Sequence, residues 1–249
     1  KSLFFFGLKG MGIGNWETPE ISGERDFILS FVEKFNAPVV IDVGANIGNY
    51  SIMLKSASST TKIFAFEPHP TTFKKLEMSA EKYDFTAINA ACGSEISVGT
   101  LYDHGNANLE TGTEHASLVK NVIEEVHSVD AKTWSVNITT IDSFVKKEEI
   151  TRINLLKIDV EGGEMNVLLG AIESIKDQLI DLIHFEFTEA NTVSRVFMKD
   201  FYELLADFTF YRMLSDGLAP LGQYYSLSAE IFGYQNIIAV RKELDFEFH

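Results

Sequence analysis

One short stretch constrains this chain more than any other, because an apolar run ends in an acid and leads directly into a glycine loop. Residues 39–43 read Val-Val-Ile-Asp-Val, residues 44–48 read Gly-Ala-Asn-Ile-Gly, and an amphipathic stretch follows. This order predicts a buried strand, a tight turn and a helix N-terminus, the geometry in which open α/β sheets bind nucleotide-like ligands. Gly44 and Gly48 would let a ligand approach the backbone closely, although glycine in such a turn can also serve packing alone.

Apolar runs and amphipathic stretches alternate along most of the chain. The expected strands are residues 39–43, 62–66, 85–89, 153–158, 179–187, 208–214 and 233–241. The expected helices are residues 23–35, 47–56, 70–82, 141–147 and 194–207, with a further helix opened by residues 159–163. Strands that alternate with helices imply a parallel sheet with right-handed crossovers. We therefore predict a three-layer, Rossmann-like α/β fold around a sheet of seven strands, with the last two strands paired antiparallel.

Two segments stand outside this alternation. Residues 1–36 comprise a glycine-rich, aromatic segment and the first helix, and we expect them on the substrate side as a connection or lid. Residues 37–249 then form the main domain. Within it, residues 93–138 are polar, with a helical pattern over 118–126. This stretch is expected to be an insertion at the carboxyl edge of the sheet, where substrate-selecting elements belong.

Charge and cysteine content narrow the classes of function. The chain has 21 basic and 36 acidic residues, which gives a net charge of −15, so a nucleic-acid partner is not expected. Cys92 is the single cysteine, which excludes a disulfide framework and a cysteine zinc site and favours a reducing, cytoplasmic location. No apolar run approaches the roughly 20 residues that a membrane span needs. A small molecule or a sugar is therefore the expected partner.

A second acid closes the next expected strand. Glu67 follows the apolar residues 63–66, lies 19 residues beyond Gly48 and is followed by Pro68. A carboxylate at this place can accept hydrogen bonds from both hydroxyls of a ribose. The alternative is an acid that is stabilised at a helix N-terminus by the helix dipole. Together with the glycine loop, Glu67 predicts a bound cofactor that contains adenosine.

The loop residues indicate which adenosine cofactor this is. Dinucleotide-binding loops carry a glycine where this chain has Asn46, and Asp42 would repel a phosphate but attract a cation. These residues favour S-adenosylmethionine, with Asp42 facing its ammonium side or holding the loop. Asn46 could hydrogen-bond the cofactor carboxylate, and Ser51 could do the same or simply cap the helix. Two alternatives stay open, an NAD(P)-dependent Rossmann oxidoreductase and a non-catalytic module that binds the cofactor.

Three segments carry a family pattern in this order: residues 41–48, residues 66–68 and residues 156–164. Together they resemble the FkbM family of class I, S-adenosylmethionine-dependent methyltransferases, over about residues 38–187 with a weaker tail at 236–240. The resemblance implies the seven-stranded class I methyltransferase fold. It also implies methyl transfer, commonly to a hydroxyl oxygen on a sugar, a glycan or a small natural product.

The resemblance further implies where the adenine lies. In class I enzymes the adenine passes the end of the third strand, where this chain has Ala90, Ala91 and Cys92. Small side chains suit a flat ring at this place. Cys92 has no basic neighbour in the sequence to lower its pKa, so we expect it in the wall of the adenine pocket and not as a nucleophile.

Three charged residues end the fourth expected strand. Lys157, Asp159 and Glu161 alternate with apolar residues, so their side chains point the same way if the strand stays extended. Charges on such a strand are costly to bury unless they are paired or solvated. We expect Asp159 on the sulfonium side of the active site and Glu161 at the next helix or the substrate. The alternative is a Lys157–carboxylate pair that steadies the strand end.

Methyl transfer to an alcohol also needs a base within hydrogen-bond reach of the hydroxyl. The candidates are Asp159, His184, Glu186, His104 and His115. A lone histidine on an apolar strand is more often a core residue with its hydrogen bonds satisfied, which weakens the case for His184. Carboxylates could also bind magnesium, but no spacing signature demands a metal, and we expect none.

Overall fold

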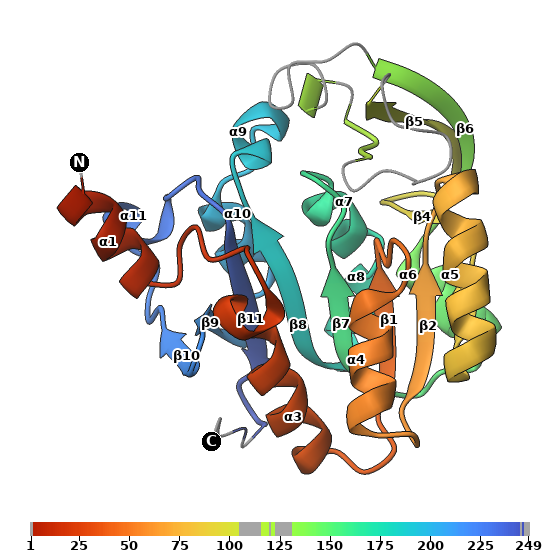
Figure 1. The fold of residues 1–249 in the computed structure, drawn as a ribbon, viewed down its shortest axis with the longest axis horizontal. Helices are drawn as coiled ribbons and strands as arrows, with labels where there is room; N and C mark the ends of the chain where they lie inside the picture. The colour runs from red at the N-terminus through yellow and green to blue at the C-terminus, as the bar shows by residue number, and fades with distance from the viewer. Residues whose placement is uncertain (1, 105–115, 120, 123–130, 245, 247–249) are drawn as a thin grey trace.

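The alternating strands build one central sheet, which a computed structural model describes together with its flanking helices (Figure 1). The described residues are 2–104, 116–119, 121–122, 131–244 and 246. Much of the expected helical pattern over 118–126 lies outside them, as do His115 and the side chain of His104.

Within the described residues, the central sheet has the strand order β10-β9-β11-β8-β7-β1-β2-β3. Its strands are β1 (Val39–Val43), β2 (Lys62–Phe66), β3 (Thr86–Ile88), β7 (Ile153–Ile158), β8 (Ile180–Phe187), β9 (Phe208–Leu214), β10 (Gly217–Pro220) and β11 (Gln235–Arg241). The five strands from β3 to β8 run parallel, and β11 pairs antiparallel with both β8 and β9. The Rossmann-like α/β fold and the antiparallel pair at the end of the chain are thus confirmed.

The sheet has eight strands instead of the predicted seven. The additional strand is β10, which pairs antiparallel with β9 from Gly217 opposite Leu214 to Pro220 opposite Tyr211. The two residues between these strands, Ser215 and Asp216, form a turn. A two-residue turn folds the chain back on itself as a hairpin, so β10 covers an edge of β9 that would otherwise be open.

Helices cover both faces of the sheet and complete three layers (Figure 1). One face packs against α3 (Glu24–Lys34), α4 (Asn49–Ala57) and α5 (Pro70–Tyr83). The other packs against α6 (Ile141–Lys147), α7 (Glu164–Leu169), α8 (Ile172–Lys176) and α10 (Met198–Leu204). The helix expected over 194–207 is shorter than predicted, because residues up to Ser194 belong to α9 (Ala190–Ser194), Arg195 has the left-handed conformation, and α10 covers only Met198–Leu204. Among the described helices, none combines the length and the apolar character required to cross a bilayer.

The N-terminal segment has more structure than its sequence pattern indicates. It contains α1 (Ser2–Gly10) and α2 (Pro19–Ser22), and two of its glycines pack tightly against β9. A Cβ atom on Gly12 would lie 2.4 Å from the Met213 carbonyl oxygen, and one on Gly23 would lie 1.9 Å from that of Leu214. Both glycines also have positive φ angles, so no other residue fits these contacts without strain.

The predicted insertion contributes a second, smaller sheet with the order β4-β6-β5. Its strands are β4 (Ala91–Cys92), β5 (Ser97–His104) and β6 (Ala131–Thr139). β5 and β6 are antiparallel and extend beyond the carboxyl ends of β1 and β2 (Figure 1). This places one of their faces over the edge of the central sheet where ligands bind in α/β folds.

Candidate active site

A cavity of about 760 Å³, measured with its open mouth, lies at the carboxyl ends of β1, β2 and β7. Its walls are formed by Val43, Gly44, Glu67, Pro68, Ala90, Ala91, Cys92, Leu101, Ala116, Leu118, Asp159, Val160, Glu161, Gly163 and Asn166. The expected cofactor contacts Gly44, Glu67, Pro68, Ala91, Cys92 and Asp159 are therefore gathered around one cavity.

The glycine loop after β1 is held close to the neighbouring loops. Gly44 has φ +79°, and a Cβ atom there would lie 1.7 Å from the carbonyl oxygen of Asp159. Gly48 has φ +94° and precedes α4, but it faces Leu76 of α5 and not the cavity. Gly44 thus forms part of the cavity wall, whereas the small size of Gly48 serves helix packing.

Glu67 is a nearly buried carboxyl group in the cavity wall. Its Oε2 accepts a hydrogen bond from the backbone N–H of Asn46 at 3.1 Å, and its Oε1 accepts one from the backbone N–H of His69 at 2.7 Å. Burial raises the pKa of Glu67 to about 7, although these N–H groups and His69 lower it in part. Each carboxylate oxygen has a second lone pair, so Glu67 could also accept hydrogen bonds from two hydroxyls in the cavity. Asn46 itself acts on this group through its backbone.

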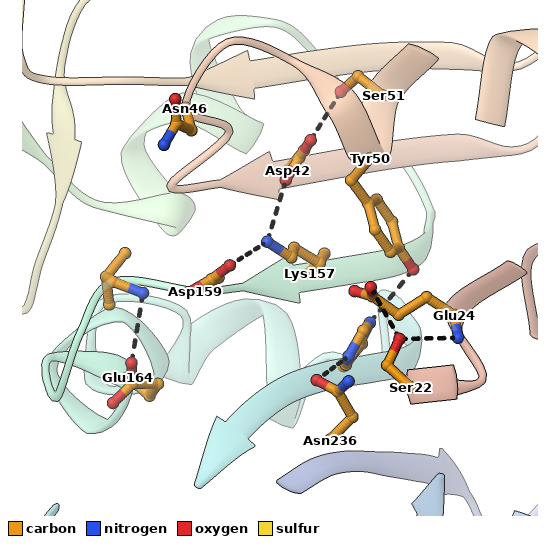
Figure 2. A network of polar contacts seen from close by, with 12 residues as sticks. Ser22, Glu24, Asp42, Asn46, Tyr50, Ser51, Lys157, Asp159, Glu164 and Asn236 are labelled. Atoms are coloured by element: carbon orange, nitrogen blue, oxygen red, sulfur yellow. Dashed lines mark hydrogen bonds and ion pairs between the residues drawn. The ribbon is translucent and has the colours of Figure 1, made fainter. Parts of the chain in front are cut away.

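Asp42 and Ser51 lie below the cavity, in contact with each other. Ser51 donates a hydrogen bond to Asp42 at 2.7 Å, and Lys157 Nζ lies 3.9 Å from Asp42 and 2.8 Å from Asp159 (Figure 2). All but Asp159 are buried. Burial raises the pKa of Asp42, and Lys157 opposes that shift. Asp42 and Lys157 therefore form a buried ion pair whose lysine fixes Asp159 at the cavity.

The alternation that begins in β7 ends directly after Asp159. Glu161 has φ +54° and Gly162 has φ +89°, so the backbone turns sharply away from an extended course. The carboxylate of Glu164 stabilises this turn by accepting hydrogen bonds from the N–H groups of Val160 and Gly162. Burial is the main cause that raises the pKa of Glu164 to about 7. Glu161 reaches the cavity wall through this turn and not through strand alternation.

The two candidate bases on β8 occupy different environments. His184 is fully buried, with Nδ1 3.2 Å from the Tyr50 hydroxyl and Nε2 3.0 Å from Asn236 Oδ1. Burial lowers the pKa of His184 to about 4. Glu186 is partly exposed, and burial together with the charges of Asp159 and Glu161 raises its pKa well above the ordinary value. His184 has the contacts of a core residue, whereas Glu186 faces charges that border the cavity.

The site also contains residues that the sequence pattern does not reveal. Glu24, at the start of α3, accepts a hydrogen bond from Ser22 at 3.1 Å and lies in the same polar cluster as Tyr50 and Lys157 (Figure 2). Burial raises the pKa of Glu24, and Asp159 adds to that shift. No hydrophobic period marks this residue, and it reaches the cluster only because the glycines of the N-terminal segment pack on β9.

The side of the cavity that is expected to border an adenine is apolar. Ala91 and Cys92 belong to β4, and the insertion adds Leu101, Ala116 and Leu118. Cys92 is buried, and burial raises the pKa of its thiol, which keeps it protonated. In the part of the chain that the structure describes, no group of three or more His, Cys, Asp or Glu side chains is arranged to hold a metal ion.

Comparison with known protein families identifies the family of this chain. A model of the methyltransferase FkbM domain matches residues 42–213, from β1 to the end of β9. The chain belongs to the FkbM methyltransferase family. The resemblance carried by the three sequence segments is thereby confirmed, and with it the class I methyltransferase fold.

Single relatives and solved structures share 30% or less of their residues with this chain over the matched regions. The chain is 30% identical over 173 residues to the hexuronic acid methyltransferase AglP of Haloferax volcanii, which covers 67% of this chain and 65% of that protein. It is 26% identical over 171 residues to the 31-O-demethyl-FK506 methyltransferase FkbM of Streptomyces tacrolimicus, covering 61% and 66%. The crystal structure of a methyltransferase FkbM from Methylobacillus flagellatus superposes with a TM-score of 0.50 at 11% identity, over 82% of this chain and 44% of that one. The chain thus matches about two thirds of the length of these curated relatives.

Proposed function

We propose that this protein is an S-adenosylmethionine-dependent O-methyltransferase that acts on a hydroxyl of a sugar, a glycan or a small natural product. The observation that carries the proposal is the position of Glu67 and Asp159 at one cavity, beside Gly44, whose missing side chain lets its loop pack against the Asp159 backbone. A carboxylate, a close backbone and a second carboxylate suit a ribose, a methionine chain and a sulfonium, respectively. Membership of the FkbM family supports the same cofactor.

Different residues would contact different parts of this cofactor. Glu67 would accept the ribose hydroxyls, and Pro68, Ala91 and Cys92 would border the adenine. Asp159 would lie on the sulfonium side. When bound, S-adenosylmethionine supplies an electrophilic methyl group. Asp42, Gly48 and Ser51, which do not line the cavity, would support these contacts indirectly by holding the loop and Lys157 in place.

We assign the general base to Glu186. It lies on β8, where burial and the charges of Asp159 and Glu161 raise its pKa, and a carboxylate with a raised pKa is a stronger proton acceptor than an ordinary one. As the acceptor oxygen bonds to the methyl carbon and the carbon–sulfur bond breaks, the hydroxyl proton would pass to the Glu186 carboxylate. His184 is the weaker candidate, because both of its ring nitrogens already lie within hydrogen-bond distance of core groups.

The choice of acceptor class rests on relatives and on charge. The names of two relatives specify a hexuronic acid and 31-O-demethyl-FK506, and a sugar acid and an O-demethyl compound both offer hydroxyl groups. The net charge of −15 makes a nucleic acid a poor partner for this chain. These points support a small hydroxylated acceptor.

Isothermal titration with S-adenosylmethionine, S-adenosylhomocysteine and NAD tests the proposed cofactor. We expect the two sulfur compounds to bind and NAD not to bind, because Asn46 stands where a pyrophosphate loop needs glycine. Binding of NAD without S-adenosylmethionine would instead support an oxidoreductase. A screen of hydroxylated acceptors by mass spectrometry then separates an enzyme from a non-catalytic module, which would bind the cofactor but methylate none of them.

A further inference from the structure

His69 links the ribose side of the cavity to the start of α5. It follows Pro68, which lines the cavity, and its backbone N–H donates the 2.7 Å hydrogen bond to Glu67. Its side chain is the N-cap of α5: Nδ1 accepts hydrogen bonds from the backbone N–H groups of Thr71 and Thr72, both at 3.3 Å. Because Nδ1 accepts, the proton of the neutral ring must be on Nε2.

The protonated nitrogen of His69 points toward the small sheet. Nε2 lies 3.4 Å from Asp103 Oδ2, and both side chains are buried, with 4% and 3% exposed. This separation is long for a hydrogen bond, and among the described residues Nε2 has no hydrogen-bond partner. Burying an N–H group without an acceptor costs free energy, and the carboxylate of Asp103, which faces this N–H group, reduces that cost.

The same face of the small sheet borders the cavity. Asp103 lies two residues after Leu101 on β5, so the two side chains share a face, and Leu101 lines the cavity. Trp134, which is paired with Leu101 across β5 and β6, packs edge-on against the His69 ring with the ring centres 5.0 Å apart. His69 therefore contacts both strands of the hairpin that carries this wall.

We propose that His69 is a positioning residue for the cofactor, and that its contact with Asp103 holds the β5–β6 hairpin against the loop of residues 67–70. The contact keeps Leu101 in the adenosine wall while the backbone of His69 keeps Glu67 oriented. This inference rests on the proposed function in one respect, that adenosine occupies this cavity. A histidine that serves only as a helix cap would have no effect on the hairpin.

Two substitutions separate these roles. His69→Asn retains a short side-chain oxygen that caps a helix well but cannot reach Asp103. Asp103→Ala removes the carboxylate and leaves the cap untouched. Thr100→Ala, at an exposed position on β5, is the matched control.

Hydrogen exchange and cofactor titration on the full chain test the proposal. We expect both variants to exchange faster in residues 97–104 without ligand, to retain wild-type exchange in α5, and to bind S-adenosylmethionine about tenfold more weakly. The double variant should bind S-adenosylmethionine no more weakly than either single variant.

Unchanged exchange in residues 97–104 and unchanged affinity in both variants would overturn the proposal, as would faster exchange confined to α5. If His69→Asn fails to fold, Asp103→Ala alone decides. Failure of the wild-type protein to bind S-adenosylmethionine would refute the proposed function, whereas exchange in residues 97–104 would still test the contact.

Discussion

The two sides of the cavity are built in different ways. The side around Glu67, Ala91 and Cys92 consists of apolar walls, backbone groups and one acid, contributed by β2 and β4. The side around Asp159 and Glu161 adjoins a cluster of charges that includes Glu186, and in this cluster Lys157 offsets several acids. The first side can recognise a ligand by shape and a few hydrogen bonds. The second includes buried charges, which cost folding free energy, and this arrangement is expected where a proton must move.

The largest effect on the charged side should follow from Glu186→Gln. This variant keeps the shape of the side chain but cannot accept the hydroxyl proton, so methyl transfer should slow by roughly 10²–10⁴-fold. Affinity for S-adenosylmethionine should stay at the wild-type value, because Glu186 is not among the proposed cofactor contacts. Single-turnover rates and calorimetry measure the two quantities. An unchanged transfer rate would show that another group is the base.

The next largest effect should follow from Lys157→Met, which leaves Asp42 buried without its cation. Breaking a buried pair in this way costs about 3–5 kcal/mol in the free energy of unfolding. Urea denaturation measures it, with Lys176→Met, an exposed lysine, as the control. Addition of Asp42→Asn to Lys157→Met should recover part of the loss. If the single variant were as stable as wild type, the ion pair would not organise this side.

The two sides also differ in what the sequence can predict. The sequence predicts β1, β2, β7, β9 and α6 to the residue, because polar, glycine or proline residues flank their apolar patterns. It also predicts that Gly44 and Glu67 reach one cavity. It cannot predict that Asp42 and Ser51 turn inward to each other, because Asp42 is compensated by Lys157, which lies 115 residues away in the chain.

Other parts of the site depend on contacts that no local pattern records. Glu24 reaches the charged cluster because Gly12 and Gly23 pack on β9, and glycine alone does not specify its partner. The left-handed backbone at Glu161 is held by Glu164, and it ends the alternation that the sequence suggests. The β5–β6 sheet is missed because apolar and polar residues do not separate onto its two faces: Val98 is exposed, while Asp103 is buried.

A smaller effect is the pH dependence of the free energy of unfolding, to which carboxyl groups on both sides contribute. Burial raises the folded pKa of Glu67 and of Glu164 to about 7, above the ordinary 4.5. The folded state therefore binds protons more tightly than the unfolded state, and the free energy of unfolding should fall as pH rises from about 4.5 to about 7. The slope is at most about 1.4 kcal/mol per pH unit for each group. Glu164→Gln should remove the contribution of Glu164 to the slope of the free energy of unfolding against pH. A pH dependence identical to that of the wild-type protein would contradict the raised pKa of Glu164.

The smallest effect is expected for Cys92→Ala on the apolar side. The thiol is buried and protonated, so its loss should change cofactor affinity and transfer rate by less than about 1 kcal/mol, roughly fivefold. Calorimetry and initial rates measure both. Abolished transfer with intact cofactor binding would make Cys92 a participant in the chemistry and remove the contrast between the two sides.

The central claim is that the apolar side holds the adenosine of S-adenosylmethionine through Glu67. Titration of the Glu67→Ala variant with S-adenosylmethionine tests it most directly, next to the wild-type protein and with thermal unfolding as a check of the fold. The lost hydrogen bonds from the ribose to a charged acceptor should weaken binding by about 1.5–3 kcal/mol. A folded Glu67→Ala protein that binds S-adenosylmethionine as tightly as wild type would contradict the account.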